Sequence, residues 1–244
     1  MNPVRTFATT GRVLRQLSHD PRSIALLLLA PSLLVGLFSW LLSDQDGAFD
    51  RFGGPILALF PFILMFIITS VTTLRERRSG TLERLLTTPL GKGDFIAGYA
   101  LAFGLVATVQ ALVTVWFAVA VCGLSVDGAV WQLGAVAVVD ALLGTGLGLL
   151  ASAFARTEFQ AVQFMPAIVF PQILLGGLLM PRDAMPEALE AISDWLPLSY
   201  AIDAVNAVTA GDEGWDLGGP LLVIGAVTVV ALGLAALTLR RRTP

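Results

Sequence analysis

Six long apolar runs, separated by short polar segments, dominate the hydropathy pattern of this chain. Each run approaches the roughly 20 residues that a helix needs to cross the hydrocarbon core of a bilayer. We place the runs at residues 24–43, 56–74, 95–123, 130–155, 163–180 and 219–239. The third and fourth are long enough to tilt or to project beyond the bilayer. The pattern predicts an all-α integral membrane protein with six transmembrane helices in one domain, residues 1–244.

The segment before the first run, residues 1–22, has an amphipathic pattern. On a helical wheel its larger apolar residues share one side and its arginines gather on another. The apolar side holds Val4, Phe7, Leu14 and Leu17, and the basic side holds Arg5, Arg12 and Arg15. This pattern is typical of a helix that lies in the membrane interface. An ordinary basic tail is the alternative that the sequence leaves open.

An acidic segment, residues 181–218, separates the fifth run from the sixth. Pro186 can start one short helix that extends to Asp194, and Pro197 can start a second that extends to about Val208. Both helices are too short to cross a bilayer. We predict that they are re-entrant and dip into the outer leaflet.

Composition supports a membrane protein and excludes several chemistries. The chain has 56% hydrophobic and 14% charged residues, with a mean hydropathy of +0.80. One cysteine and one histidine leave no intrachain disulfide, no usual zinc ligand set and no His-dependent triad, so no metal site or catalytic residue is predicted. No phosphate-binding Gly-rich loop of the Gly-Lys-Ser/Thr type occurs. Any ATP-driven step must therefore come from another chain.

The basic residues divide unevenly between the segments that connect the runs. With a cytoplasmic N-terminus, 13 of the 15 lie on the cytoplasmic side, and only Arg51 and Arg182 lie outside. Twelve of the 18 acidic residues lie outside. The positive-inside rule therefore predicts that both termini are cytoplasmic. The basic C-terminus then serves as an anchor at the inner surface, and no nucleic-acid partner is expected.

A dense charged island, residues 75–94, follows the second run. Thr81 can cap a short helix that Pro89 and Gly91 end. On that helix Leu82, Leu85 and Leu86 form an apolar ridge with no evident core to cover it, so the ridge favours a partner protein. The alternative from the charge pattern is a solvated basic loop between two spans.

The same island carries a motif. Glu76, the pair Gly80-Thr81, Glu83, Leu85 and the pair Thr88-Pro89 resemble the coupling segment of type 2 ABC-transporter permeases, a group that includes the daunorubicin-resistance permeases. The later order of Pro171, Gly176, Pro181, Pro186, Trp195, Pro197, Ser199-Tyr200-Ala201 and Asp203-Ala204 resembles the end of the same family. Leu196 and Asn206 depart from the residues that are common there, from which we expect altered packing within the same fold.

This resemblance implies a permease of the bacterial cytoplasmic membrane that exports a hydrophobic or amphipathic molecule, drug-like or lipid-like. It implies a homodimer of permeases and two separate ATPase subunits, which bind ATP and Mg²⁺, so this chain needs no cofactor. The residues that it assigns to ATPase coupling are Glu76, Gly80, Thr81, Leu82, Glu83, Arg84, Leu85, Leu86, Thr88 and Pro89. An ion-coupled secondary transporter and a membrane scaffold without transport activity are the rival classes.

Candidate residues for the substrate path lie within the spans. By resemblance, the second and fifth spans supply Phe60, Phe62, Met65, Phe66, Phe164, Met165 and Phe170. Prolines and glycines in these two spans predict irregular backbone at membrane depth. Asp140, an ionisable residue deep in the fourth span, is a candidate path residue or a helix-to-helix hydrogen-bonding group, with Gln110 as its possible partner. Gly144, Gly146 and Gly148 predict a strip of close helix packing, with a flexing gate as the alternative.

Overall fold

The computed structural model describes residues 2–45, 47–79, 91–212 and 214–238, and those residues form an all-helical membrane fold. Six helices are long and apolar enough to cross a bilayer, which confirms the predicted class. They are α2 (Pro21–Leu41), α3 (Ala48–Arg78), α5 (Lys92–Ala120), α6 (Val130–Phe154), α7 (Glu158–Leu175) and α10 (Trp215–Thr238). The shorter elements are α1 (Pro3–Ser18), η1 (Arg182–Ala184), α8 (Glu187–Ser193) and α9 (Pro197–Ala210). The predicted coupling helix lies outside the described residues.

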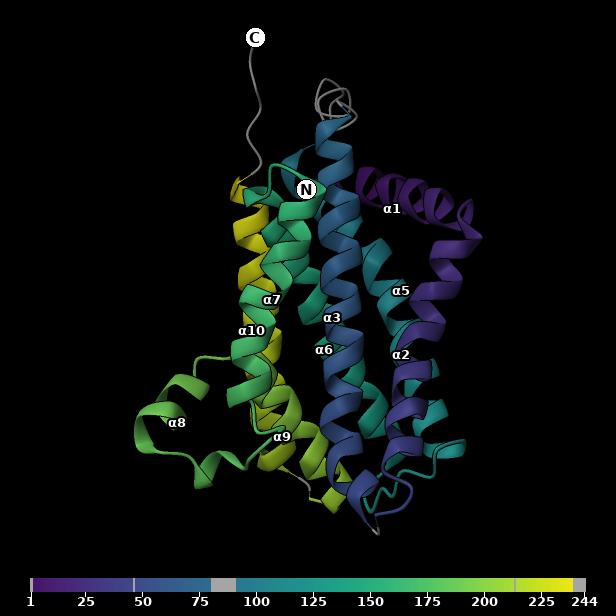
Figure 1. Ribbon diagram of the computed structural model, residues 1–244. Coiled ribbons are helices and arrows are strands. Elements are labelled where there is room, and N and C mark those ends of the chain that lie inside the picture. The colour runs from purple at the N-terminus through teal and green to yellow at the C-terminus, as the bar shows by residue number, and fades with distance from the viewer. Residues whose placement is uncertain (1, 46, 80–90, 213, 239–244) are drawn as a thin grey trace.

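The membrane-length helices stand side by side with α3 and α6 at the centre, while α1 lies across one end of the bundle (Figure 1). We call this end, where α1 and the C-termini of α3 and α6 lie, the basic end. The opposite end, where α8 and α9 lie, is the acidic end. For the charged residues that the structure describes, the segregation expected from the sequence is a separation in space.

Helices α3 and α6 approach each other closely because α6 has glycine at the contact. A Cβ atom added at Gly144 would lie 2.4 Å from the carbonyl oxygen of Phe62, and one at Gly148 would lie 2.5 Å from that of Phe66. Gly146 faces α10 instead, near Thr228. The expectation of a single glycine strip was therefore wrong. Residues two apart on a helix point to nearly opposite sides, and the glycines serve two different interfaces.

The observed spans start and end where local signals dictate. Thr157 caps α7, since its side-chain oxygen accepts a hydrogen bond from the backbone nitrogen of Gln160 at 3.1 Å. The same helix ends before Gly177, whose φ of 91° is left-handed. Helix α3 is continuous through Pro61, and α7 through Pro166. The irregular backbone expected at the prolines is not seen, whereas the irregular backbone expected at the Gly176-Gly177 pair is confirmed, since α7 ends at Leu175.

Helix α1 is docked and is not a free basic tail. Its buried side consists of Thr6, Thr9, Thr10 and Val13. The hydroxyl of Thr10 donates to the carbonyl oxygen of Gly98 on α5 at 3.2 Å. A Cβ atom at Gly98 would lie 2.6 Å from Cβ of Thr9, so the glycine permits the close approach. Val4 and Phe7 stay exposed, as expected for a helix that presents an apolar side to lipid.

Helix α9 is packed into the acidic end against α3, α6 and α10, whereas α8 extends away from the bundle (Figure 1). Both termini of α9 are satisfied by other segments. The side-chain oxygen of Gln172 accepts from the backbone nitrogen of Leu198 at 3.0 Å, and the backbone nitrogen of Gly128 donates to the carbonyl of Val208 at 3.1 Å. These two bonds satisfy backbone groups at the ends of α9 that the helix itself leaves without partners.

Tryptophan marks the level of the acidic end. The protein has five tryptophans, and all of them are exposed. They lie near the acidic ends of α2, α5, α6 and α10 or just before α9, at Trp40, Trp116, Trp131, Trp215 and Trp195. Tryptophan prefers the boundary between lipid and water. The acidic end therefore has the aromatic belt of a membrane surface.

Candidate transport path and coupling end

A buried ion pair ties the end of α3 to α1. Glu76, in the last turn of α3, is 5% exposed. The Nη1 and Nη2 atoms of Arg12 donate to its two carboxylate oxygens at 3.0 and 3.1 Å, and Nη2 also donates to the hydroxyl of Tyr99 on α5 at 2.9 Å. Partial burial lowers the pKa of Arg12, but the interactions with Glu76 and Tyr99 outweigh it and hold that pKa above its ordinary value.

A second bond joins α1 to the start of α5. The backbone nitrogen of Asn2 donates to Oδ1 of Asp94 at 2.8 Å, and the backbone nitrogen of Gly91 donates to Oδ2 at 3.2 Å. Helix α1 is thus bonded near both ends of the predicted coupling segment, to Glu76 near its start and to Asp94 at its end. These contacts join residues far apart in the sequence, and no local pattern indicates them.

The last turn of α3 contacts two further helices. Arg75 makes two hydrogen bonds with Glu158 at the start of α7, at 2.8 and 3.0 Å. Nη1 of Arg77 donates to the carbonyl oxygen of Ser152 on α6 at 3.1 Å. The Arg75 pair is exposed and adds little stability by itself. The predicted coupling residues other than Glu76 lie outside the described residues.

The candidate path residues of α3 lie on two different sides of that helix. Phe62, Met65 and Phe66 are fully buried in the bundle interior. Phe60 is half-buried, with its ring centroid 5.8 Å from that of Phe38 on α2. It shares its side with a stripe of half-buried apolar residues that sequence reasoning missed, Ile63, Leu64, Ile67, Ile68 and Val71. We call these residues, with Phe60, the α3 stripe.

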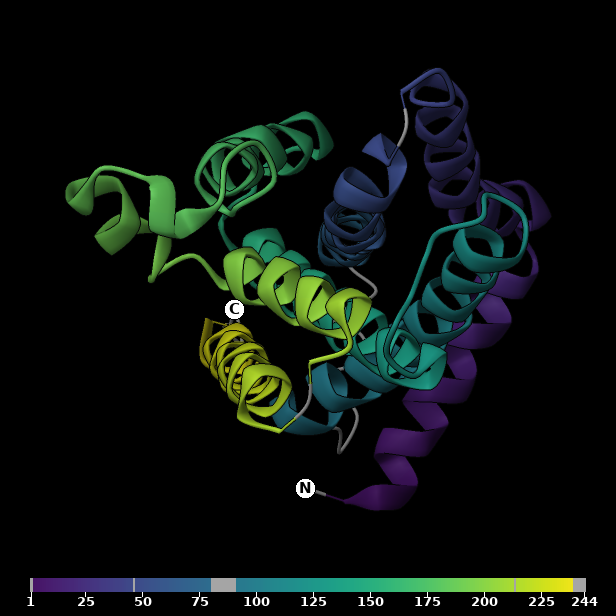
Figure 2. The ribbon, with the colours of Figure 1, turned by 90° about the horizontal axis from the view of Figure 1, so that it is seen from below.

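Helix α7 is the less buried neighbour of α3. Seen along the bundle from the acidic end, α3 lies between α2 and α7 (Figure 2). Phe164 packs against a small cluster that includes Leu74 at the basic end, and Met165 is partly buried against the main core. Phe170 is 57% exposed. The candidate residues of α7 therefore differ in their surroundings, from the cluster at the basic end to an exposed surface.

Asp140 is buried in α6 without a hydrogen-bond partner. It is 0% exposed, and neither carboxylate oxygen has a partner among the described residues. The expected pairing with Gln110 is not seen, since Nε2 of Gln110 donates to the carbonyl oxygen of Leu27 at 3.0 Å. A carboxylate in such a place is costly, which keeps Asp140 a candidate for function.

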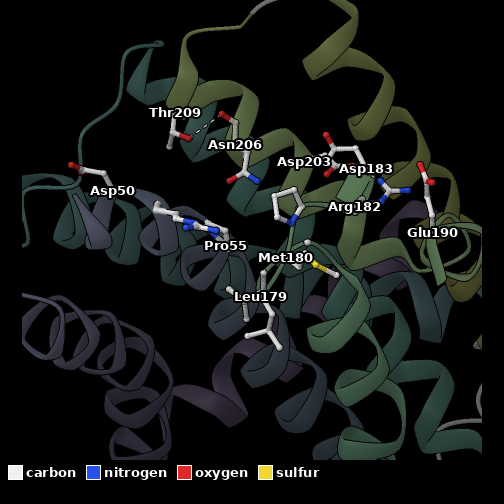
Figure 3. A pocket seen from close by; sticks show the side chains of 14 residues that line it. Asp50, Pro55, Leu179, Met180, Arg182, Asp183, Glu190, Asp203, Asn206 and Thr209 are labelled. Atoms are coloured by element: carbon white, nitrogen blue, oxygen red, sulfur yellow. Dashed lines mark hydrogen bonds and ion pairs between the residues drawn. The ribbon is translucent and has the colours of Figure 1, made fainter. Parts of the chain in front are cut away.

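The acidic end contains a cavity of about 670 Å³ (Figure 3). It is lined by α3, α8, α9 and the segment that follows α7. Arg182 donates to the carboxylates of Asp194 and Asp203, and its guanidinium lies 5.4 Å from the ring centroid of Tyr200. The hydroxyl of Tyr200 donates to the carbonyl of Asp194 at 2.9 Å. Arg182 thus clamps the segment after α7 to α8 and α9.

No cluster of three or more metal-ligating side chains occurs in the described ranges. The α3 stripe and the last turn of α3 belong to one continuous helix, which closely spaced backbones hold against α6.

Comparison with known proteins identifies the family. Residues 5–209 match the model of the ABC-2 type transporter family. The chain is 30% identical over 191 residues to the probable multidrug ABC transporter permease YbhR of Escherichia coli, an alignment that covers 77% of this chain and 51% of the relative. It is 29% identical over 193 residues to the linearmycin resistance permease protein LnrN of Bacillus subtilis, covering 72% and 48%. A third relative, ABC transporter G family member 20 of Dictyostelium discoideum, is 27% identical over 168 residues, covering 68% and 23%.

The chain spans about half the length of the bacterial relatives that it matches. The match nevertheless extends over most of the chain and includes α1, the α3 end and α9. The end of α3 contains the start of the coupling motif, and α9 contains the later motif and packs into the acidic end. The chain therefore belongs to the ABC-2 type transporter family, as the sequence motifs predicted.

Proposed function

We propose that this chain is the membrane-spanning permease subunit of an ATP-driven exporter. Two copies work with two separate ATPase subunits, and the complex moves a hydrophobic or amphipathic molecule, drug-like or lipid-like, out of the cytoplasm or the inner leaflet. Family membership supports this proposal, as do the names of the relatives, which record multidrug transport and linearmycin resistance. Both termini are cytoplasmic in this proposal, and the acidic end faces outward.

The bonding of the basic end is the observation that carries the proposal. The predicted coupling segment, residues 75–94, joins α3 to α5, and α1 is bonded near both of its ends through Glu76 and Asp94. Helix α3 runs without a break for 31 residues from this end to the acidic end. A force on the segment therefore displaces a long rigid helix together with α1.

The mechanism follows from that connection. ATP binding closes the two ATPase subunits on each other, and the coupling segment moves with them. Helix α3 transmits the movement to the α3 stripe, and α7 follows through its contacts with α3. The α3 stripe and the exposed side of α7 are apolar surfaces that this chain leaves uncovered, so they suit contact with lipid or with a second permease. When α3 and α7 move, a path between these surfaces and the second copy opens or closes.

The decisive experiment tests the coupling segment. The chain, tagged and co-expressed with its ATPase subunit, is purified, and ATP-dependent export is measured in inverted vesicles. We expect the double substitution Glu83→Ala and Leu85→Ala to abolish both co-purification and export. The matched control, Glu187→Ala with Leu189→Ala, makes the same chemical change on α8 and leaves both intact. Full association of the coupling variant with the ATPase would refute the assigned role, as would labels showing residues 75–94 on the outer surface.

Asp140 favours a second candidate function, an ion-coupled secondary transporter, because its buried carboxylate has no partner in the described part of the chain. Such a transporter would keep working in ATP-depleted vesicles that hold a proton gradient. The Asp140→Asn variant would then lose transport. If export stops on ATP depletion and Asp140→Asn retains it, this candidate is excluded. If no transport is seen under any condition, the remaining alternative is a membrane scaffold without transport activity.

A further inference from the structure

The cavity at the acidic end contains both of the arginines that the sequence places outside. Arg51 lies in the first turn of α3 and Arg182 lies in η1, yet both line the same cavity of about 670 Å³. The volume lies within the range of cavities that bind small molecules.

The two arginines differ in their ion-pair partners among the described residues. The charge of Arg182 is matched by Asp194 and Asp203, which it bonds directly. Arg51 has no carboxylate within ion-pair distance among the described residues, and its guanidinium lies 5.3 Å from the ring centroid of Phe52. The neighbouring carboxylate of Asp50 accepts from the backbone nitrogen of Ser125 at 2.9 Å. Arg51 is therefore a cation with room for an anionic ligand.

Uncompensated carboxylates lie on another wall of the cavity. Asp183 in η1 and Glu190 in α8 are exposed and make no side-chain hydrogen bond or ion pair within the described ranges. Figure 3 shows both beside Arg182 at one end of the cavity, whereas Asp50, next to Arg51 in the chain, lies at the other end. With respect to the described residues, the cavity therefore offers an unpaired guanidinium on its α3 wall and unpaired carboxylates on its η1 and α8 wall.

The remaining side of the cavity is apolar. Leu179 and Met180 line it and are 57% and 41% exposed. In Figure 3 they lie across the cavity from Asn206 and Thr209 of α9. The exposed tryptophans place this end of the bundle at the level of lipid headgroups. One cavity at that level thus has a cationic wall, an anionic wall and an apolar side.

We propose that this cavity binds the zwitterionic headgroup of an ethanolamine phospholipid. The phosphate binds Arg51, since a guanidinium fork matches phosphate oxygens. The primary ammonium has three donors for the carboxylates of Asp183 and Glu190, and the acyl chains leave over Leu179 and Met180. An anionic lipid would leave the carboxylates unmatched, and a simple cation would leave Arg51 unmatched. The site depends on the membrane placement of the acidic end and not on ATPase coupling, so either proposal can fail alone.

Binding to the purified full-length chain tests the proposal. Detergent-solubilised protein is titrated with phosphatidylethanolamine or with phosphatidylglycerol of the same acyl chains, and bound lipid is counted by native mass spectrometry. We expect preference for the ethanolamine lipid and a loss of about tenfold in its affinity in Arg51→Gln, since a hydrogen-bonded charge contact is worth about that factor. The double substitution Asp183→Asn with Glu190→Gln should lower the affinity for phosphatidylethanolamine and raise the affinity for phosphatidylglycerol.

Matched controls separate this site from general attraction to lipid. Arg156→Gln removes an exposed arginine at the basic end, and Asp44→Asn with Glu187→Gln removes two exposed acidic charges from the acidic end outside the cavity. Both controls should bind like the unmodified chain. Equal affinity of the unmodified chain for the two lipids would overturn the proposal, as would an equal loss in Arg156→Gln. If free phosphoethanolamine bound as tightly as the lipid, the conclusion that the ligand is a lipid headgroup would be overturned.

Discussion

The contact between α3 and α6 yields the sharpest test of this structure. In Gly148→Ala the new Cβ atom would lie 2.5 Å from the carbonyl oxygen of Phe66 and 3.1 Å from its Cα atom, whereas an ordinary contact begins at 3.4 Å. Both close atoms belong to the backbone, so no side chain can rotate away. The two helices must separate by about 1 Å, which disturbs the packing along their whole interface.

The expected cost follows from two opposing terms. Forcing one extra carbon into a packed interface costs about 1–3 kcal/mol. Exchanging glycine for alanine within a helix returns about 0.5–1 kcal/mol. The net loss for Gly148→Ala or Gly144→Ala is therefore about 0–2.5 kcal/mol, with a centre of about 1 kcal/mol. For a chain of this size the central value lowers the midpoint of thermal unfolding by about 2–4 °C, and the upper limit lowers it by about 10 °C.

The control is Gly146→Ala on the same helix. Its Cβ atom would lie 3.4 Å from the carbonyl oxygen of Thr228, which is an ordinary contact, so the gain in helix propensity should dominate. Each variant is purified in one detergent, and unfolding is followed by intrinsic fluorescence during heating. We expect Gly146→Ala to equal or exceed the unmodified chain. If Gly148→Ala were as stable as Gly146→Ala, the close approach of α3 and α6 would be refuted.

Three further substitutions probe the basic end and the buried carboxylate. Arg12→Met leaves Glu76 buried without its partner and should lower the free energy of unfolding by about 2–4 kcal/mol, a range reduced because the Arg12 side chain is 32% exposed. The control Arg15→Met changes an exposed side chain and should cost under about 0.5 kcal/mol. Chemical denaturation in mixed micelles measures both losses, and equal losses would contradict the buried pair. Gly98→Ala should loosen the docking of α1, because the new Cβ atom would lie 2.6 Å from a side-chain carbon of α1. Limited proteolysis should then cut within residues 3–18 faster than in the unmodified chain. Unchanged cleavage would argue against this docking. Asp140→Asn should change stability by less than about 1 kcal/mol, because no partner is lost within the described chain, and a larger loss in thermal unfolding would reveal a partner outside it.

Much of the architecture was predictable because its signals are local. A run of about 20 apolar residues crosses a bilayer whatever surrounds it, and the arginines in the connections orient it. Pro197 set the start of α9 and Gly211, with a φ of 81°, set its end. The motif from Glu76 to Pro89 identified the family for the same reason, since its spacing is written within 14 residues.

The candidate path was harder to predict, because within a membrane both sides of a helix are apolar. Phe60 and Phe62 are equivalent by composition, yet the first belongs to the α3 stripe and the second is buried in the core. The helical period separates Gly146 from Gly148, but the sequence cannot tell which of the two faces α3. Which side of each helix meets its neighbour depends on the packing of the whole bundle.

The sequence by itself determined the number of spans, the amphipathic first helix, the segregation of charge and the family, since each follows from length, period or spacing along the chain. Only the tertiary structure decided that Arg12 bonds Glu76, that Asp94 bonds the backbone of Asn2, and that Arg51 and Arg182 share one cavity. These groups meet because separate helices bring them to the same place. A side chain's charge is encoded locally, but its partner is set by the packing of the whole bundle.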